Sequence, residues 1–263
     1  MTKRLLGWLL PALLFPGLSR AMCAMSNLRA FPATATLAPT SILILEGYEA
    51  SQPVIRALNK KYPVYLVSSS ERVRLRVQAL HEGQFHLTQA VVRPERPLKP
   101  GQTYTLVIEG VESYNAPVRY NNRLRRSEPY QYTVLAPTRP PASVSWLTYP
   151  HESKKTLVQY GCGPATNVFF DFALSVPTAD TAFVVKAEVR SQATGRTTTF
   201  YLESEKGRVG IGHGMCSGGF TFDQGTAYLV SFTLIDGEGH PLVATREALA
   251  FTKPTVETDP LDR

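Results

Sequence analysis

Residue types that build reactive centres are scarce in this sequence. Its 263 residues include three cysteines, two tryptophans and five histidines, and the histidines are scattered along the chain. Neither a Gly-x-Ser-x-Gly nor a His-Glu-x-x-His motif is present, which excludes the hydrolase and zinc-peptidase signatures that these motifs mark. No glycine-rich segment ends in Gly-Lys-Ser/Thr, so a Walker loop is also absent. We therefore expect no catalytic residues and no cofactor.

Long hydrophobic runs are missing as well, apart from one near the start. Leu5–Leu18 is apolar but has about 14 residues, fewer than the roughly 20 that a membrane-spanning helix needs. Lys3 and Arg4 precede the run, and Ser19-Arg20-Ala21 follows it with the small residues of a signal-peptidase site. This pattern predicts a signal peptide over residues 1–24 and export to the periplasm or the exterior.

Cys23 is a candidate for a lipid anchor. A lipoprotein leader carries an apolar residue three positions before its lipidated cysteine, and here Arg20 stands in that position. The leader therefore favours cleavage without lipidation.

Basic and acidic residues are nearly balanced once the leader is set aside. Of 28 Lys and Arg, three lie in the leader, which leaves 25 against 21 Asp and Glu. This balance does not point to nucleic acid. Residues 37–136 are net basic and residues 142–263 are net acidic. Such a division favours either docking between the two parts or an ordinary solvated surface.

Alternating apolar residues dominate the rest of the chain. In Arg72–Val77 every second residue is apolar, so Val73, Leu75 and Val77 are predicted to face a core while the arginines face out. Further strands are predicted at residues 42–45, 63–67, 85–91, 103–109, 130–135, 143–149, 167–175, 182–191, 197–202, 227–235 and 248–251. Short strands separated by turn residues are typical of sandwiches and barrels.

A proline-rich segment, 137–142, divides these strands into two series. Its three prolines remove hydrogen-bond donors and stiffen the chain, as in a linker. The sequence predicts an all-β chain with two tandem Ig-like or fibronectin III-like β-sandwich domains, at residues 37–136 and 143–253. Residues 25–36 are expected to be a flexible lead-in, and a short helix is expected near Pro53.

Each series contains a Gly-x-x-Tyr unit followed by alternating apolar residues, at Gly101–Ile108 and Gly225–Phe232. Glycine permits the turn, and the tyrosine hydroxyl can bond back to the backbone. A tyrosine at such a strand start recurs in Ig-like sandwiches. The alternative is a chance similarity between two units that each consist of a turn and a strand.

The segment Leu98–Gly110, with its approach Arg93–Leu98, resembles the late strand of bacterial Ig-like export domains, as in S-layer-associated modules and copper-resistance protein C. The resemblance covers residues 37–136 and implies an Ig-like fold. Copper-resistance protein C would also imply a metal-ligating histidine near the mature N-terminus. No histidine precedes His81, so copper carriage is not implied here.

Cys162 and Cys216 are expected to form a disulfide after export, because the compartment is oxidising and each has glycines close by in the sequence. Two free thiols or a metal site are the alternatives. A metal site would use His213 and Met215 with Cys216, a soft ligand set that suits copper(I), but a bonded Cys216 would not ligate. The glycines of residues 210–219 predict a flexible or closely packed strand end.

Seven arginines are candidate residues for binding an anion or a partner. They are Arg72, Arg74 and Arg76 on one strand face, and Arg119, Arg123, Arg125 and Arg126 in a basic loop. Guanidinium groups bind carboxylate, phosphate or anionic glycan groups, and solvated arginines are the alternative. In an exported protein the expected partner is an envelope protein or an anionic glycan.

The leading hypothesis is an exported, non-catalytic protein that binds a partner or supports a cell-envelope assembly. One alternative is periplasmic copper or metal handling. Another is a hydrolase whose site is assembled from distant loops, in which Glu203 and Glu205 would act as acid and base.

The disulfide gives a first testable prediction. The loop that it would close has about 55 residues, so replacement of Cys162 by serine should lower the free energy of unfolding by about 4 kcal/mol. Urea denaturation of the mature protein measures this difference. Under reducing conditions the two proteins should unfold at the same urea concentration. Equal midpoints under oxidising conditions would contradict the pairing.

Overall fold

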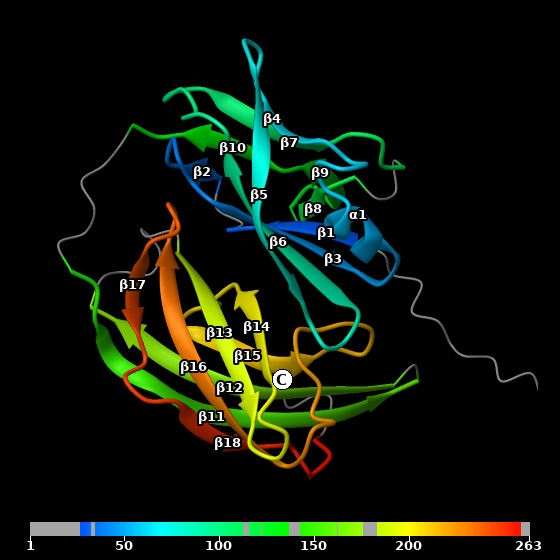
Figure 1. The fold of residues 1–263 in the computed structure, drawn as a ribbon, viewed down its shortest axis with the longest axis vertical. Coiled ribbons are helices and arrows are strands. Elements are labelled where there is room, and N and C mark those ends of the chain that lie inside the picture. Colours follow the sequence, from blue (N-terminus) through cyan, green and yellow to red (C-terminus); the bar gives the residue numbers. More distant parts are fainter. Residues whose placement is uncertain are drawn as a thin grey trace, which may run out of the picture.

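The computed structural model describes residues 27–32, 35–112, 116–121, 123–136, 143–161, 163–175 and 183–258. These residues form β-strands with one short α-helix and one 3₁₀ turn, so the predicted all-β class is confirmed (Figure 1). Within them, no helix is long and apolar enough to cross a membrane. The predicted signal peptide, Cys23 and the linker lie outside the described residues. We call residues 27–136 the N-terminal half and residues 143–258 the C-terminal half.

One eight-stranded sheet makes up most of the N-terminal half. Its strands are β1 (Asn27–Phe31), β2 (Thr36–Leu37), β3 (Leu43–Tyr48), β4 (Val64–Val67), β5 (Arg72–Glu82), β6 (Leu87–Pro94), β7 (Thr103–Ile108) and β10 (Gln131–Val134). They are arranged in the order β1-β3-β6-β5-β4-β7-β10-β2. The start of β5 pairs with β4, and the rest of β5 pairs with β6. The strands on both sides of β5 contribute to one buried core.

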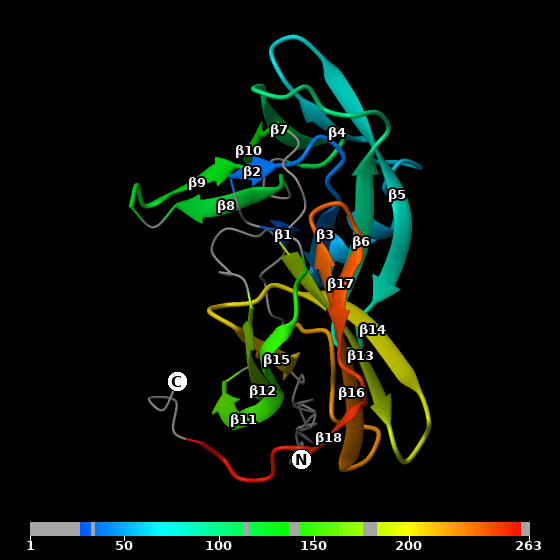
Figure 2. The same ribbon diagram turned by 90° about the vertical axis from the view of Figure 1, so that its left-hand side faces the viewer.

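Three smaller elements complete this half. The 3₁₀ turn η1 (Glu49–Ser51) leads into helix α1 (Gln52–Arg56), which has proline in its first turn as predicted. Strands β8 (Val118–Asn121) and β9 (Arg126–Pro129) form a hairpin with its own two-stranded sheet. Figure 2 shows this hairpin projecting from the body of the half.

The C-terminal half contains two sheets. One consists of β11 (Trp146–Tyr160), β12 (Gly163–Leu174) and β15 (Arg208–His213). The other consists of β13 (Phe183–Ser191), β14 (Thr197–Leu202), β16 (Ala227–Asp236), β17 (Pro241–Ala244) and β18 (Leu249–Thr252). Both sheets contribute to one aromatic core, in which Phe170 of β12 lies edge-on to Phe232 of β16, with ring centroids 5.2 Å apart.

The predicted alternation is confirmed in β5, where Val73 and Leu75 are buried, Val77 is partly buried, and Arg72, Arg74 and Arg76 are exposed. The tyrosines of the two Gly-x-x-Tyr units are also buried. The hydroxyl of Tyr104 accepts a hydrogen bond from the Lys99 amide at 3.0 Å, and that of Tyr228 donates to the Gly225 carbonyl at 2.8 Å. Each hydroxyl therefore bonds back to the turn before its strand, as expected.

The expectation of a flexible lead-in at residues 25–36 was wrong. Within this segment, β1 pairs with β3 and β2 pairs in parallel with β10. Leu28, Ala30 and Phe31 are buried, so the described part of the segment contributes to the core. The sequence also did not predict β8, β9, β15 or β17. These strands are short or rich in glycine, and their pairing depends on the neighbours that the fold supplies.

The two halves meet through buried contacts. A third apolar cluster joins Ile44 and Val91 of the N-terminal half to Val184 of the C-terminal half. Gln89, which is 1% exposed, crosses the same junction. Its Nε2 donates to the Tyr201 carbonyl and to Glu46 Oε2, both at 2.8 Å, and its Oε1 accepts from the Tyr201 amide at 2.8 Å. One side chain thus satisfies two backbone groups across the junction and a carboxylate in its own half.

We expect the Gln89→Ala variant to lose about 2–4 kcal/mol of stability, because it would leave the Tyr201 amide and carbonyl without their partner in a buried site. Urea denaturation of the mature protein measures the change. Gln192→Ala is the matched control, since this glutamine is exposed and should change stability by less than about 0.5 kcal/mol. Similar unfolding curves for the two variants would show that Gln89 does not hold the junction.

Candidate functional site

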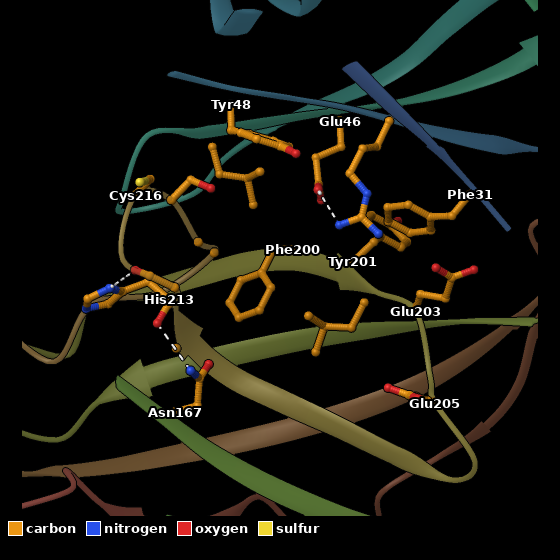
Figure 3. A pocket seen from close by; sticks show the side chains of 18 of the residues that line it. Phe31, Glu46, Tyr48, Asn167, Phe200, Tyr201, Glu203, Glu205, His213 and Cys216 are labelled. Carbon is orange, nitrogen blue, oxygen red and sulfur yellow. Dashed lines mark hydrogen bonds and ion pairs between the residues drawn. The ribbon is translucent and has the colours of Figure 1, made fainter. Parts of the chain in front are cut away.

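A cavity of about 720 Å³ lies at the junction of the two halves (Figure 3). Strands β1 and β3 supply Arg29, Glu46 and Tyr48, and strand β14 supplies Phe200 and Tyr201. Residues 203–205 and the segment 212–219 complete the lining. The volume falls within the range of roughly 300–1,000 Å³ that small-molecule sites occupy. The cavity exists only because both halves contribute walls.

Strand pairing places the polar residues of the N-terminal wall. Arg29 on β1 is the register partner of Glu46 on β3, and their side chains lie 3.9 Å apart. Glu46 and Tyr48 are two residues apart on one strand, so they point to the same face, while the intervening Gly47 faces the core side. Figure 3 shows this face opposite Phe200 and Tyr201. Apolar rings therefore face a polar pair across the cavity.

The carboxyl group of Glu46 is in an unusual electrostatic position. Its side chain is only 14% exposed. Burial raises the pKa of Glu46, and repulsion from Glu203 adds to the effect. The hydrogen bond from Gln89 and the charge of Arg29 act in the opposite direction but do not outweigh the burial. Glu46 therefore keeps its proton to a higher pH than an exposed glutamate.

The glycine-rich segment forms a closely packed wall, one of the two alternatives that the sequence left open. A Cβ atom at Gly212 would overlap the Thr166 carbonyl oxygen, and one at Gly218 would overlap His213. A Cβ at Gly219 would lie 2.6 Å from the ring of Phe200. Only glycine allows the backbone to approach its neighbours this closely.

The residues of the copper alternative, His213 and Met215, both line the cavity. Nδ1 of His213 lies 2.7 Å from the Gly214 carbonyl oxygen, and its ring packs against Phe85 with centroids 4.5 Å apart. The described part of the chain contains no group of three or more His, Cys, Asp or Glu residues that could hold a metal ion.

Of the two cysteines in the predicted disulfide, the structure describes only Cys216. Cys216 lines the cavity, whereas Cys162 lies outside the described residues. Its neighbour Gly163 is close to the other cysteine's segment, since a Cβ atom on Gly163 would lie 3.8 Å from the Met215 carbonyl oxygen. The pairing stays a prediction, and this proximity supports it.

The arginines of β5 already have partners. Arg72 forms an ion pair with Glu109 at 2.6 Å and lies over the ring of Tyr65. Arg76 forms one with Glu95 at 3.2 Å, and Arg74 Nε donates to Asn59 Oδ1 at 3.1 Å. These contacts leave the strand face largely neutralised.

The arginines of the basic loop lie elsewhere. They belong to the β8–β9 hairpin, which Figure 2 shows on the opposite side of the N-terminal half from β5. The structure therefore does not bring the two predicted arginine groups together. Neither group lines the cavity.

Sequence reasoning named some cavity residues but missed the cavity itself. Glu203 and Glu205, considered as an acid–base pair, both line it. Arg29 was missed because it lies in the segment expected to be flexible. Glu46 could have been noticed as a charged residue that interrupts an apolar strand pattern.

No family model and no curated protein matches this chain. Among solved structures it is similar to a type I pullulanase from Bacillus subtilis in complex with maltose, with 11% identity and a TM-score of 0.24 over 86% of this chain and 24% of that one. It is also similar to the N-terminal part of the bacterial S-layer protein SbsC, with 12% identity and a TM-score of 0.26 over 86% of this chain and 44% of that one. The chain spans about a quarter of the length of the pullulanase. Similarities at this level identify neither a family nor a function.

The raised pKa of Glu46 predicts how stability depends on pH. Between the ordinary value of 4.5 and the raised value, the folded protein binds more protons than the unfolded chain, so stability falls as pH rises through that interval. The Glu46→Gln variant cannot ionise at this position. It should therefore be more stable than the wild type at about pH 8, and the difference should shrink toward about pH 4.

Urea denaturation at a series of pH values measures the difference. Glu247→Gln is the control, because Glu247 is exposed and lies away from the cavity. A Glu46→Gln variant that is less stable than the wild type at high pH would contradict the unfavourable burial of the carboxylate.

Proposed function

We propose that this chain is an exported, non-catalytic protein of two Ig-like β-sandwich domains that binds a partner in the cavity between them, within the cell envelope. The observation that carries the proposal is the cavity of about 720 Å³, whose walls come from both halves. The leader at residues 1–24 supports export.

Two domains are supported by the separation of the cores. One apolar cluster lies wholly within the N-terminal half, another lies wholly within the C-terminal half, and a smaller third cluster joins them. The equivalent buried tyrosines, Tyr104 and Tyr228, support Ig-like architecture in both. Clefts between domains are frequent binding sites, because each domain can present side chains from a rigid sheet.

The chemistry of the lining suits recognition of a polar partner. Arg29 offers donors only, whereas Glu203 and the ionised form of Glu46 offer acceptors. The aromatic residues Tyr48 and Tyr201 combine apolar surface with a hydroxyl group, a combination that is common in interfaces. The predicted partner is therefore a polar group of an envelope protein or a glycan that inserts between the halves.

The hydrolase alternative is favoured by one specific observation. Glu46 and Glu203 line the same cavity, and a carboxyl group with a raised pKa is what general acid catalysis requires. The two functions differ in the fate of the partner, which a binding protein releases unchanged. The intact mass of the partner before and after incubation distinguishes them.

A variant that blocks the cavity tests the proposal. Glu203→Trp should place a large ring at the exposed edge of the cavity, and Glu247→Trp makes the same change at an exposed site outside it. Immobilised mature protein is incubated with envelope extract, and the recovered partner is purified and titrated against each variant. Wild type and Glu247→Trp should bind alike, while Glu203→Trp should bind at least about tenfold more weakly, a loss of about 1.4 kcal/mol.

Equal binding by all three proteins would remove the cavity from the function. If no partner is recovered by the wild type, the proposal of partner binding fails.

A further inference from the structure

The β8–β9 hairpin forms a sheet of its own at the side of the N-terminal half. Its two strands pair with each other and with no other strand among the described residues. In Figure 2 it extends sideways from the body of the half, and at its base β8 adjoins β1. An element in this position is free to contact a surface while the cavity stays open.

The side chain of Asn121 bonds to the backbone that follows β8. Its Oδ1 accepts hydrogen bonds from the amides of Arg123 and Leu124, both at 3.1 Å. These bonds hold the backbone of Arg123 and Leu124 close to the end of β8.

Positive charge is concentrated at this tip. The hairpin carries four arginines and a single acidic residue, Glu128. Glu128 is engaged by Arg126, with an Nε–Oε1 distance of 3.0 Å, and by Asn121 at 2.8 Å. Within the described ranges, no carboxylate forms an ion pair with Arg123 or Arg125. The tip therefore presents two exposed arginines that have no ion-pair partner in the described part of the chain.

Apolar side chains accompany these charges. Leu124 lies between Arg123 and Arg125 and is 52% exposed, and Tyr120 on β8 is 60% exposed. Single exposed apolar residues are common, but here both lie on a projecting, cationic element. A soluble polyanion would pair with the arginines and leave Leu124 in water. A lipid surface would satisfy both kinds of side chain.

We propose that the β8–β9 tip docks onto an anionic phospholipid surface. Arg123 and Arg125 contact lipid phosphates, Leu124 enters the boundary between headgroups and acyl chains, and Tyr120 lies at headgroup level. Basic residues next to exposed apolar residues bind membranes in this way, and tyrosine is enriched at membrane interfaces. The hairpin would thus hold the protein beside a membrane while its cavity binds a separate partner.

Sedimentation with vesicles tests the proposal on the full mature chain. The wild type should sediment with vesicles that contain phosphatidylglycerol and remain in solution with pure phosphatidylcholine, and added salt should weaken binding. The double variant Arg123→Ser/Arg125→Ser should bind these vesicles at least about tenfold more weakly than the wild type. Leu124→Ser keeps every charge and should also weaken binding.

The β5 strand provides a matched control. Arg74→Ser/Arg76→Ser removes the same net charge from exposed positions on the opposite side of the half, and it should bind vesicles like the wild type. Thermal unfolding of each variant confirms that it is folded. The fluorescence of a Tyr120→Trp variant should shift to shorter wavelength when phosphatidylglycerol vesicles are added.

Three results would overturn the proposal. One is equal loss of binding in the β5 control, which would show that only net charge matters. Another is tight binding to heparin, a soluble polyanion, together with no effect of Leu124→Ser, which would assign the tip to anionic glycans. The third is no sedimentation of the wild type at low salt.

Discussion

The junction between the two halves depends on the hydrogen bonds of one buried side-chain amide, that of Gln89. A carboxamide removed from water needs partners for its oxygen and its nitrogen, and Gln89 finds them on Tyr201 and Glu46. Apolar contacts, such as those in the cluster that contains Val91 and Val184, tolerate small displacements, whereas hydrogen bonds require particular distances and angles. The amide therefore selects one arrangement of the halves. Because Tyr201 and Glu46 also line the cavity, the same bonds set the shape of the candidate site.

The cavity gains its chemical character from incomplete charge compensation. Glu46 is withdrawn from water, yet Arg29 lies 3.9 Å away, at the outer limit of an ion pair. A group that a partner brings into the cavity would change the surroundings of this carboxyl group and hence its protonation. Binding and proton uptake or release are therefore expected to be linked at this position.

The sequence was sufficient where local pattern decides the structure. Alternation placed Val73 and Leu75 in the core, and the two Gly-x-x-Tyr units placed Tyr104 and Tyr228 at strand starts. It was insufficient where partners are distant. β1 is a strand because β3 lies beside it. β15 requires glycine at position 212 because a Cβ atom there would overlap the Thr166 carbonyl oxygen of β12. The cavity could not be foreseen for the same reason, since it joins Arg29 to Glu203 across most of the chain.

The parallel pairing of β2 with β10 has a consequence for how the chain acquires its structure. Residues 36–37 come early in the sequence, yet their partners, Thr133 and Val134, are almost a hundred positions later. A chain that crosses a membrane from its N-terminus would emerge with β2 unpaired and would keep it so until β10 arrives. The outer edge of the first sheet is therefore completed last, and until then it offers an open template to any neighbouring strand.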